Sequence, residues 1–254
     1  MRRRAYAWWK KGTLLIAVTG STGALAVTYT FSRDGQADVP VCLAVQQALS
    51  RGLILDAQKP LCYRRFDVSI KATRYGFKPI NFTPVSNSRY RSLLSQMMSI
   101  VNNSKLPLTK ADKHENEAAV SRLMSSGAIK LYRAPFDNNN SGSSHVVYFL
   151  DSVRCPGDVE APRSMNPTIF MENADGTLNR SWGVGDETSG SPFIYRGQTY
   201  YIRWTSLVGA ALKNAWSQLD IYHNTPALPS SPPQDHETFS PPDCTIYQMK
   251  KGIR

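Results

Sequence analysis

Two apolar runs flank a polar, glycine-containing loop between Ala128 and Leu150. Residues 129–132 before the loop and 146–150 after it are rich in β-branched, aromatic and leucine side chains, over lengths typical of strands. Asn, Ser and Gly between them favour a tight turn. The side chains of Asn and Ser bond to the local backbone, and Gly adopts positive φ without steric cost. The stretch therefore predicts two strands joined by a loop, and it places β-structure in the second half of the chain.

The polar residues of this loop have the spacing of a calcium-binding loop. Oxygen ligands are expected from positions 1, 3, 5, 7 and 9 of such a loop, which here are Asp137, Asn139, Ser141, Ser143 (through its carbonyl) and His145. Position 6 is Gly142, where the sharp turn needs positive φ. The alternative is a polar hairpin turn in which Asn and Ser bond to their own backbone.

The D-x-N-x-S-G pattern of this loop resembles the FG-GAP and VCBS-type repeats of integrin-like β-propellers. The resemblance covers residues 128–150 and implies a strand-loop-strand unit that holds one calcium ion. It assigns ligand roles to Asp137, Asn139, Ser141 and the Ser143 carbonyl. His145 stands where the family carries a carboxylate, so the implied site is weak, because affinity depends on the charge of the ligands.

The first 26 residues have the features of an export signal. Met1–Gly12 carries five basic and no acidic residues, and the apolar run Thr13–Phe31 follows. Small residues at Ala24 and Ala26 predict cleavage after Ala26. The alternative is an uncleaved anchor in the inner membrane formed by residues 13–31. Either interpretation places the rest of the chain outside the cytoplasm, in the periplasm or the extracellular space.

The net charge of +11 owes much to this first segment. Five of the 30 basic residues precede residue 27, and the remaining 25 stand against 19 acidic residues, a formal charge of +6. No dense basic run with interleaved aromatic residues occurs, which argues against a nucleic-acid partner. The remaining basicity fits a solvated surface, or attraction to anionic lipid heads or cell-wall polymers. Contact with a membrane is otherwise predicted only through the N-terminal segment.

Four cysteines lie beyond the predicted signal: Cys42, Cys62, Cys155 and Cys244. An even number of cysteines in an oxidising compartment predicts two disulfides. Three connectivities are open, and Cys42–Cys62 with Cys155–Cys244 is preferred because each bond then closes within one region. No C-x-x-C pair occurs, so the sequence gives no support for a zinc site or thioredoxin-type redox chemistry.

A C-x-A-V-x-x-x-L run from Cys42 is followed by P-x-C-x-R-R-F from Pro60. With these patterns, residues 41–84 resemble the front end of uncharacterised exported bacterial proteins, which implies a secreted fold and no known activity. The same region predicts a short helix at about 41–50 that ends near Gly52, and then extended structure over residues 63–85.

Two amphipathic helices are predicted next. The first follows a Ser86 or Ser88 cap and carries apolar residues at helical spacing, including Met97 and Met98. The second begins with a capping pattern at Asp112 and ends at Gly127. Their apolar faces, including the two methionines, are expected to lie in the core.

From residue 128 the sequence reads mostly as strands. Hairpin turns are predicted at 173–176 and 196–198, and further strands at 219–224 and 244–250, on either side of the Pro/Ser-rich loop 225–242. The fold class is therefore a disulfide-stabilised α+β protein. A mainly helical N-terminal region (27–127) precedes an antiparallel β region (128–254), arranged as one sheet or as one to two propeller-like blades.

The stretch Gly185–Pro192 resembles the G-D-S-G-G-P segment of chymotrypsin-like and V8-like serine proteases, with Ser189 at the position of the nucleophile. Glu187 and Thr188 depart from that pattern, and neither His114 nor His145 stands in the T-A-A-H-C context of those proteases. The alternative is a Ser/Gly turn.

Four acids fall near predicted hairpin ends, where they form a solvated rim or a carboxylate pair: Glu172, Asp175, Asp186 and Glu187.

The sequence thus predicts an exported cell-envelope or secreted protein, a non-enzymatic binding or structural module that presents hairpin loops to a protein or glycan. No catalytic residues are assigned. The aromatic side chains of the strands are expected either as contact residues or as packing partners within the sheets, namely Trp182, Tyr195, Tyr200, Tyr201 and Trp204. The alternative function is an envelope hydrolase that uses Ser189 or the carboxylates near Asp186.

Overall fold

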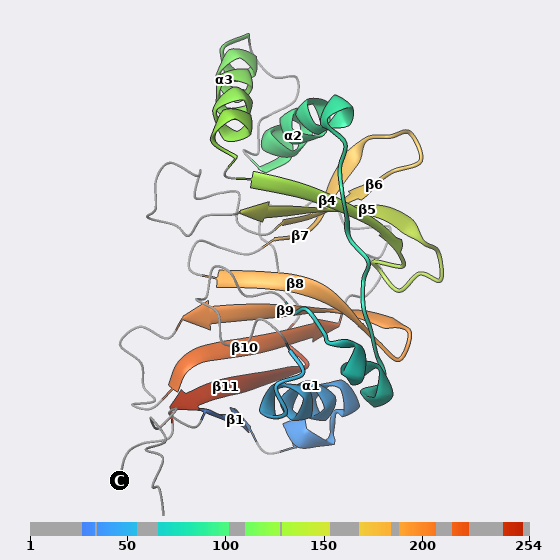
Figure 1. Cartoon of the computed structure of the whole chain (residues 1–254), viewed down its shortest axis with the longest axis vertical. Helices are drawn as coiled ribbons and strands as arrows, with labels where there is room; N and C mark the ends of the chain where they lie inside the picture. The colour runs from blue at the N-terminus through green and yellow to red at the C-terminus, as the bar shows by residue number, and fades with distance from the viewer. Residues whose placement is uncertain are drawn as a thin grey trace, which may run out of the picture.

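The strands described by the structure form two antiparallel sheets that share a buried core where they meet, and the helices lie at the two far ends of the molecule (Figure 1). The order of layers is helix, sheet, sheet, helix. The computed structural model describes residues 27–33, 35–54, 66–101, 110–127, 129–152, 168–183, 188–206, 215–223 and 241–250.

The larger sheet takes its strands from both ends of the chain, in the order β1-β11-β10-β9-β8-β2. These strands are β1 (Val27–Phe31), β2 (Phe77–Lys78), β8 (Thr188–Tyr195), β9 (Gln198–Ser206), β10 (Ala215–His223) and β11 (Cys244–Lys250). The β8–β9 hairpin turns at Arg196 and Gly197, with φ of 49° and 83°. Two residues at positive φ give the turn whose twist matches the flanking strands. The hairpin predicted at 196–198 is therefore confirmed.

The smaller sheet is built from one continuous stretch of chain between β2 and β8, in the order β3-β4-β5-β6-β7. Its strands are β3 (Thr83–Pro84), β4 (Ile129–Phe136), β5 (His145–Ser152), β6 (Thr168–Glu172) and β7 (Leu178–Gly183). The hairpin predicted at 173–176 joins β6 to β7. There the Asp175 carboxylate accepts hydrogen bonds from the hydroxyl and the amide of Thr177, and these bonds lower the pKa of Asp175 below its usual value.

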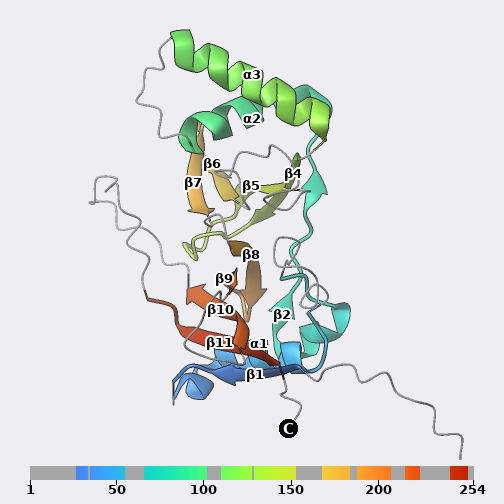
Figure 2. The same ribbon diagram turned by 90° about the vertical axis from the view of Figure 1, so that its left-hand side faces the viewer.

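The helices lie where the sequence predicts them. α1 (Pro40–Ser50) begins with a proline in its first turn, where a missing N–H costs nothing, and it packs on the larger sheet. α2 (Asn87–Val101) and α3 (Lys110–Ser126) lie over the smaller sheet, at the opposite end of the molecule (Figure 2). None of the described helices has the length and apolarity to cross a bilayer.

Two short 3₁₀ helices complete the described elements, η1 (Gln36–Asp38) and η3 (Ile70–Tyr75). η3 interrupts the extended structure predicted for residues 63–85. Its C-terminal end is set by Gly76, which adopts φ of +93° and follows Arg74 and Tyr75. The prediction was incomplete here because β-rich composition alone does not exclude a single tight helical turn.

The alternation of side chains along the strands produces the layers. In β5, Tyr148 and Leu150 join the core under α2 and α3, whereas Val147 and Phe149 join the core between the sheets. In β9, Trp204 joins the core under α1 and Tyr201 the core between the sheets. Both faces of the central strands β5 and β9 are therefore covered, and these strands need apolar residues on both sides.

The core under α2 and α3 contains the methionines of the predicted amphipathic helix. Met97 is 0% exposed and Met98 is 3% exposed, together with Leu93 and Leu94 of the same helix. The prediction that this face belongs to the core is confirmed.

The preferred disulfide pairing, Cys42–Cys62 with Cys155–Cys244, is wrong. Cys42 of α1 is bonded to Cys244 of β11 across 202 residues of sequence, with Cα atoms 6.2 Å apart. The preference for short closures failed because the last strand lies directly beneath the first helix. Cys62 and Cys155 lie outside the described residues.

The coarse fold class, helices with antiparallel sheets and a disulfide, is present. Propeller-like blades are not confirmed, because the strands divide into two sheets. The larger sheet combines β1 and β2, which precede residue 128, with strands that follow it. α3 and β4, which lie on either side of residue 128 in the sequence, pack together. The loop 225–242 falls almost wholly outside the described residues, as does the segment 1–26.

Candidate ligand-binding site between the two sheets

A cavity of about 400 Å³ lies where the two sheets meet, and we call it the inter-sheet pocket. The two sheets share its wall: Tyr132 and Phe149 come from the smaller sheet, and residues 191–193 come from β8. Residues 78–82, which connect β2 to β3, and residues 66–68 complete it. This volume falls within the usual range of small-ligand sites, about 300–1,000 Å³.

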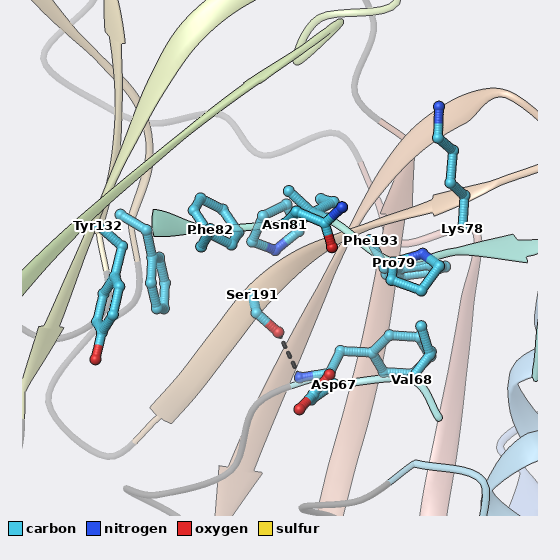
Figure 3. Close-up of a pocket in the computed structure, with 13 residues that line it drawn as sticks. Asp67, Val68, Lys78, Pro79, Asn81, Phe82, Tyr132, Ser191 and Phe193 are labelled. Carbon is cyan, nitrogen blue, oxygen red and sulfur yellow. Dashed lines mark hydrogen bonds between the residues drawn. The ribbon is translucent and has the colours of Figure 1, made fainter. Parts of the chain in front are cut away.

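The pocket wall is mostly apolar and aromatic. The rings of Phe66 and Phe193 lie with their centroids 4.3 Å apart, and those of Phe82 and Phe149 are 5.5 Å apart. Figure 3 shows Phe82 and Tyr132 together at one end, with Ser191 between them and Val68. The rings of Phe66, Phe149 and Phe193 are themselves buried, so the wall is preformed and needs little reordering to accept a ligand.

The polar groups of the pocket are few. Asp67, Lys78 and Asn81 are exposed at its rim, and Lys78 extends away from the other lining side chains in Figure 3. Ser191 is buried, and its hydroxyl oxygen accepts a hydrogen bond of 2.6 Å from the Phe66 amide. That bond fixes the segment 66–68 against β8, so Ser191 positions the wall of the pocket.

In the predicted calcium loop, the Asp137 carboxylate is hydrogen-bonded to backbone amides of the same loop. The two carboxylate oxygens of Asp137 accept hydrogen bonds from the amides of Ser141, at 2.9 Å, and Gly142, at 2.7 Å. Gly142 adopts φ of 84°, as predicted. Asp137 therefore acts as the cap of its own turn, in the manner of the polar hairpin alternative.

The two asparagines between the predicted ligands tie the loop to the other sheet. Asn140 exchanges two hydrogen bonds with the backbone of Thr199, and the Thr199 hydroxyl donates to the Asp137 carbonyl. Asn138 is fully buried, and its side-chain oxygen accepts a hydrogen bond from the Tyr201 hydroxyl. The loop thus holds β4 and β5 against β9 across the interface between the sheets.

Two of the predicted calcium ligands carry buried polar atoms for which the described structure shows no hydrogen-bond partner, Oδ1 of Asn139 and Nε2 of His145. Within the described ranges, no three His, Cys, Asp or Glu side chains are placed to hold a metal ion together. Calcium at this loop therefore stays a prediction.

We expect Asp137→Ala to lower the free energy of unfolding by about 0.5–1.5 kcal/mol, the usual net contribution of a hydrogen bond to stability. The loss should appear in excess EDTA, because the bonds to Ser141 and Gly142 involve no metal. Denaturant unfolding of both proteins with EDTA and with millimolar Ca²⁺ measures it. A loss seen only with Ca²⁺ would contradict the turn-closing role and favour the calcium site.

The candidate catalytic groups are spread over the fold. Ser189 lies within β8, paired with Trp204, so its backbone is in a strand and not in the predicted turn. Glu172 accepts a hydrogen bond of 2.7 Å from Tyr148 and forms an ion pair of 3.2 Å with Arg89. Burial and this bond raise the pKa of Tyr148. Asp186 and Glu187 lie outside the described residues, and the hydrolase hypothesis stays a prediction.

Three of the aromatic residues considered as contacts are packing residues, the other role that the sequence allowed. Trp204, Tyr201 and Tyr195 are 0%, 1% and 5% exposed. They pack in the cores because the larger sheet has a layer on each face, which the sequence does not reveal. Tyr200 is partly buried and stacks on His223. The side chain of Trp182 lies outside what the structure describes.

A partly buried ion pair lies on the face of the larger sheet that turns toward the smaller one. Asp220 is 1% exposed and accepts hydrogen bonds from Arg203 at 2.9 Å, and from Gln218 and Thr245 at 2.8 Å each. Arg203 also lies over the ring of Tyr222, 5.2 Å from its centroid. Burial, with the nearby Asp220 charge, raises the pKa of Tyr222 to about 12. No local sequence signal pointed to this group.

Comparisons with protein-family models, with curated proteins and with solved structures found no match. The inference of function therefore starts from the geometry of the inter-sheet pocket.

Proposed function

We propose that this protein is an exported, non-enzymatic binding module that takes an apolar side chain of an envelope protein into the inter-sheet pocket. The observation that carries the proposal is the preformed cavity of about 400 Å³ with an aromatic wall and polar groups at its rim. A large apolar pocket with a few convergent polar groups is the usual form of a binding site.

One feature supports export, and a second favours cleavage over an anchor. The Cys42–Cys244 bond suits an oxidising compartment. Residues 27–31 belong to β1 and pair with β11, which leaves residues 13–26 of the predicted anchor, a run shorter than the roughly 20 residues of a spanning helix. Cleavage after Ala26 would leave β1 intact, so the proposed mature protein starts at Val27.

The pocket favours a peptide side chain over a sugar ring. A sugar carries many hydroxyl groups that need hydrogen-bond partners, whereas the wall formed by Phe66, Phe149 and Phe193 is buried and apolar. Asp67 and Lys78 at the rim carry opposite charges, so the polar backbone of a bound segment would lie at the rim while its apolar group enters the pocket. Specificity would then come from the apolar group inside the pocket.

The test uses the blocked tripeptides acetyl-Gly-X-Gly-amide, with X as Ala, Leu, Phe or Glu. We expect affinity to rise from Ala to Leu to Phe, by about fourfold for each methylene buried, equivalent to about 0.8 kcal/mol. The Glu peptide should not bind, because a carboxylate would lose its hydration against an apolar wall. Isothermal titration calorimetry measures the series.

Asn81→Trp, which adds a ring at the pocket rim, is expected to abolish binding of the Phe peptide. The matched control is Asn179→Trp in β7, the same change at an exposed site that does not line the pocket. Equal affinity for the Ala and Phe peptides, or binding by Asn81→Trp at the strength of the unmodified protein, would contradict the proposal. Hydrolysis of a peptide during the titration would instead favour the hydrolase alternative.

A further inference from the structure

Three arginines and two tyrosines meet where α1, η3 and the β8–β9 turn come together. The guanidinium carbons of Arg51 and Arg74 lie 5.1 and 5.0 Å from the ring centroid of Tyr75, and Arg51 also donates a hydrogen bond to the Tyr75 hydroxyl. The guanidinium carbon of Arg196 lies 5.2 Å from the ring centroid of Tyr195. We call the three arginines and Tyr75 the arginine–tyrosine face; Tyr195 lies beneath Arg196 in the core.

A close backbone approach builds this face. The Arg196 amide donates a hydrogen bond of 2.8 Å to the Gly76 carbonyl. A Cβ on Gly76 would lie 3.1 Å from side-chain atoms of both Arg196 and Tyr195, so glycine is what lets η3 reach the hairpin turn. A groove of about 560 Å³ lies at this contact, with Arg74 and Arg196 in its wall.

The positive charge of the face is not balanced within the part of the chain that the structure describes. The ion pairs found there are Arg89–Glu172 and Arg203–Asp220, and neither involves the arginines of the face. Two guanidinium groups held beside the same ring repel each other, and an anionic group between them would offset that repulsion. The face is therefore complementary to a partner with several negative charges.

Apolar side chains are exposed beside these charges. Ile70, the first residue of η3, is 77% exposed, and Leu43 of α1 is 38% exposed. Lys71 next to Ile70 is also exposed. At a membrane surface, cations bind the headgroups while neighbouring apolar side chains enter the boundary with the acyl chains. A soluble polyanion would gain nothing from Ile70.

We propose that the arginine–tyrosine face docks on the anionic phosphate headgroups of a lipid membrane, with Ile70 entering the interface. α1, η3 and β1 lie at the same end of the molecule, opposite α2 and α3 (Figures 1 and 2). β1 is the first strand of the proposed mature protein, so this end of the molecule also carries its N-terminus. The inference does not depend on a ligand in the inter-sheet pocket.

The test is flotation with phosphatidylcholine vesicles that contain or lack phosphatidylglycerol. The chain from Val27 is used, because it contains every described helix and strand. Binding is expected only to the vesicles with phosphatidylglycerol, and it should weaken with added salt. Arg74→Gln should reduce the partition coefficient about fivefold, and Arg74→Gln with Arg196→Gln about 25-fold, since each cation near the surface contributes about 1 kcal/mol.

Ile70→Ser should also reduce the partition coefficient and leave the melting temperature unchanged, because the side chain is exposed. The matched control is Arg122→Gln with Lys130→Gln, which removes the same charge from exposed positions on α3 and β4. This control should bind vesicles like the unmodified protein. Circular dichroism of each variant checks that the fold is kept.

Three outcomes would overturn the inference. Equal binding to neutral vesicles would show that the arginines do not direct it. An equal loss in the control pair would show that net charge alone is responsible. Binding of inorganic polyphosphate that depends on Arg74 and Arg196, without binding to vesicles, would assign the face to a soluble phosphate polymer.

Discussion

Replacing Cys42 and Cys244 together by serine is expected to lower the free energy of unfolding by about 2–5 kcal/mol. The bond joins the first helix to the last strand across 202 residues, so its loss frees a very long loop in the unfolded chain. Both cysteines are 0% exposed in the core between α1 and the larger sheet. For a domain of this size each kcal/mol corresponds to about 2–4 °C of melting temperature.

The double alanine variant at the same positions is the matched control, because it removes the bond without burying two hydroxyl groups. Both variants should be destabilised, and the serine variant more so. Peptide mapping without reduction should link the peptide of Cys42 to that of Cys244. Melting temperatures equal to that of the unmodified protein would contradict a bond between α1 and β11.

Tyr201→Ala is expected to cost about 3–5 kcal/mol, the usual loss for a large aromatic side chain in a core. Tyr201 is 1% exposed between the two sheets, and its hydroxyl bonds to the buried Asn138 of the loop that follows β4. The alanine variant removes both the packing and the hydrogen bond. Denaturant unfolding measures the loss.

Tyr201→Phe separates the two contributions. It keeps the ring and removes the hydrogen bond, so we expect a loss of about 1–3 kcal/mol. Tyr247→Phe, in a partly exposed position of β11, is the matched control and should change stability little. If both phenylalanine variants behave alike, the bond between Asn138 and Tyr201 does not hold the sheets together.

Local patterns in the sequence were sufficient for the helices and hairpins. The apolar spacing around Met97 and Met98 predicts α2 and its buried face, and the turn residues at 173–176 and 196–198 predict two hairpins. These signals lie within a few residues of the structure that they form. They are therefore visible without the tertiary fold.

Contacts between distant segments could not be predicted in the same way. Cys42 meets Cys244 because the chain returns to the first helix with its last strand. In the loop after β4, the predicted ligands are the alternate residues from Asp137, whereas Asn138 and Asn140 between them contact Tyr201 and Thr199. Alternation along the loop indicates two sets of side chains that point in opposite directions. It does not indicate which of the two sets packs against the other sheet.

The inter-sheet pocket is likewise formed by segments that are distant in the sequence. Its wall combines residues 66–68, 78–82 and 191–193 with Tyr132 and Phe149, and none of these segments contains a recognisable ligand-binding pattern. A signal was present in the apolar residues of β5, since Val147 and Phe149 alternate with Tyr148 and Leu150 and all four are large. This indicates a strand covered on both faces, and hence a second sheet.

The central claim, that the inter-sheet pocket binds an apolar side chain, is tested most directly by nuclear magnetic resonance with the acetyl-Gly-Phe-Gly-amide probe. The account predicts amide shift changes at residues 66–68, 78–82 and 191–193, which saturate with the affinity measured by calorimetry. Asn81→Trp should remove them, and Asn179→Trp should not. Shift changes confined to other surfaces, or none at saturating peptide, would contradict the claim.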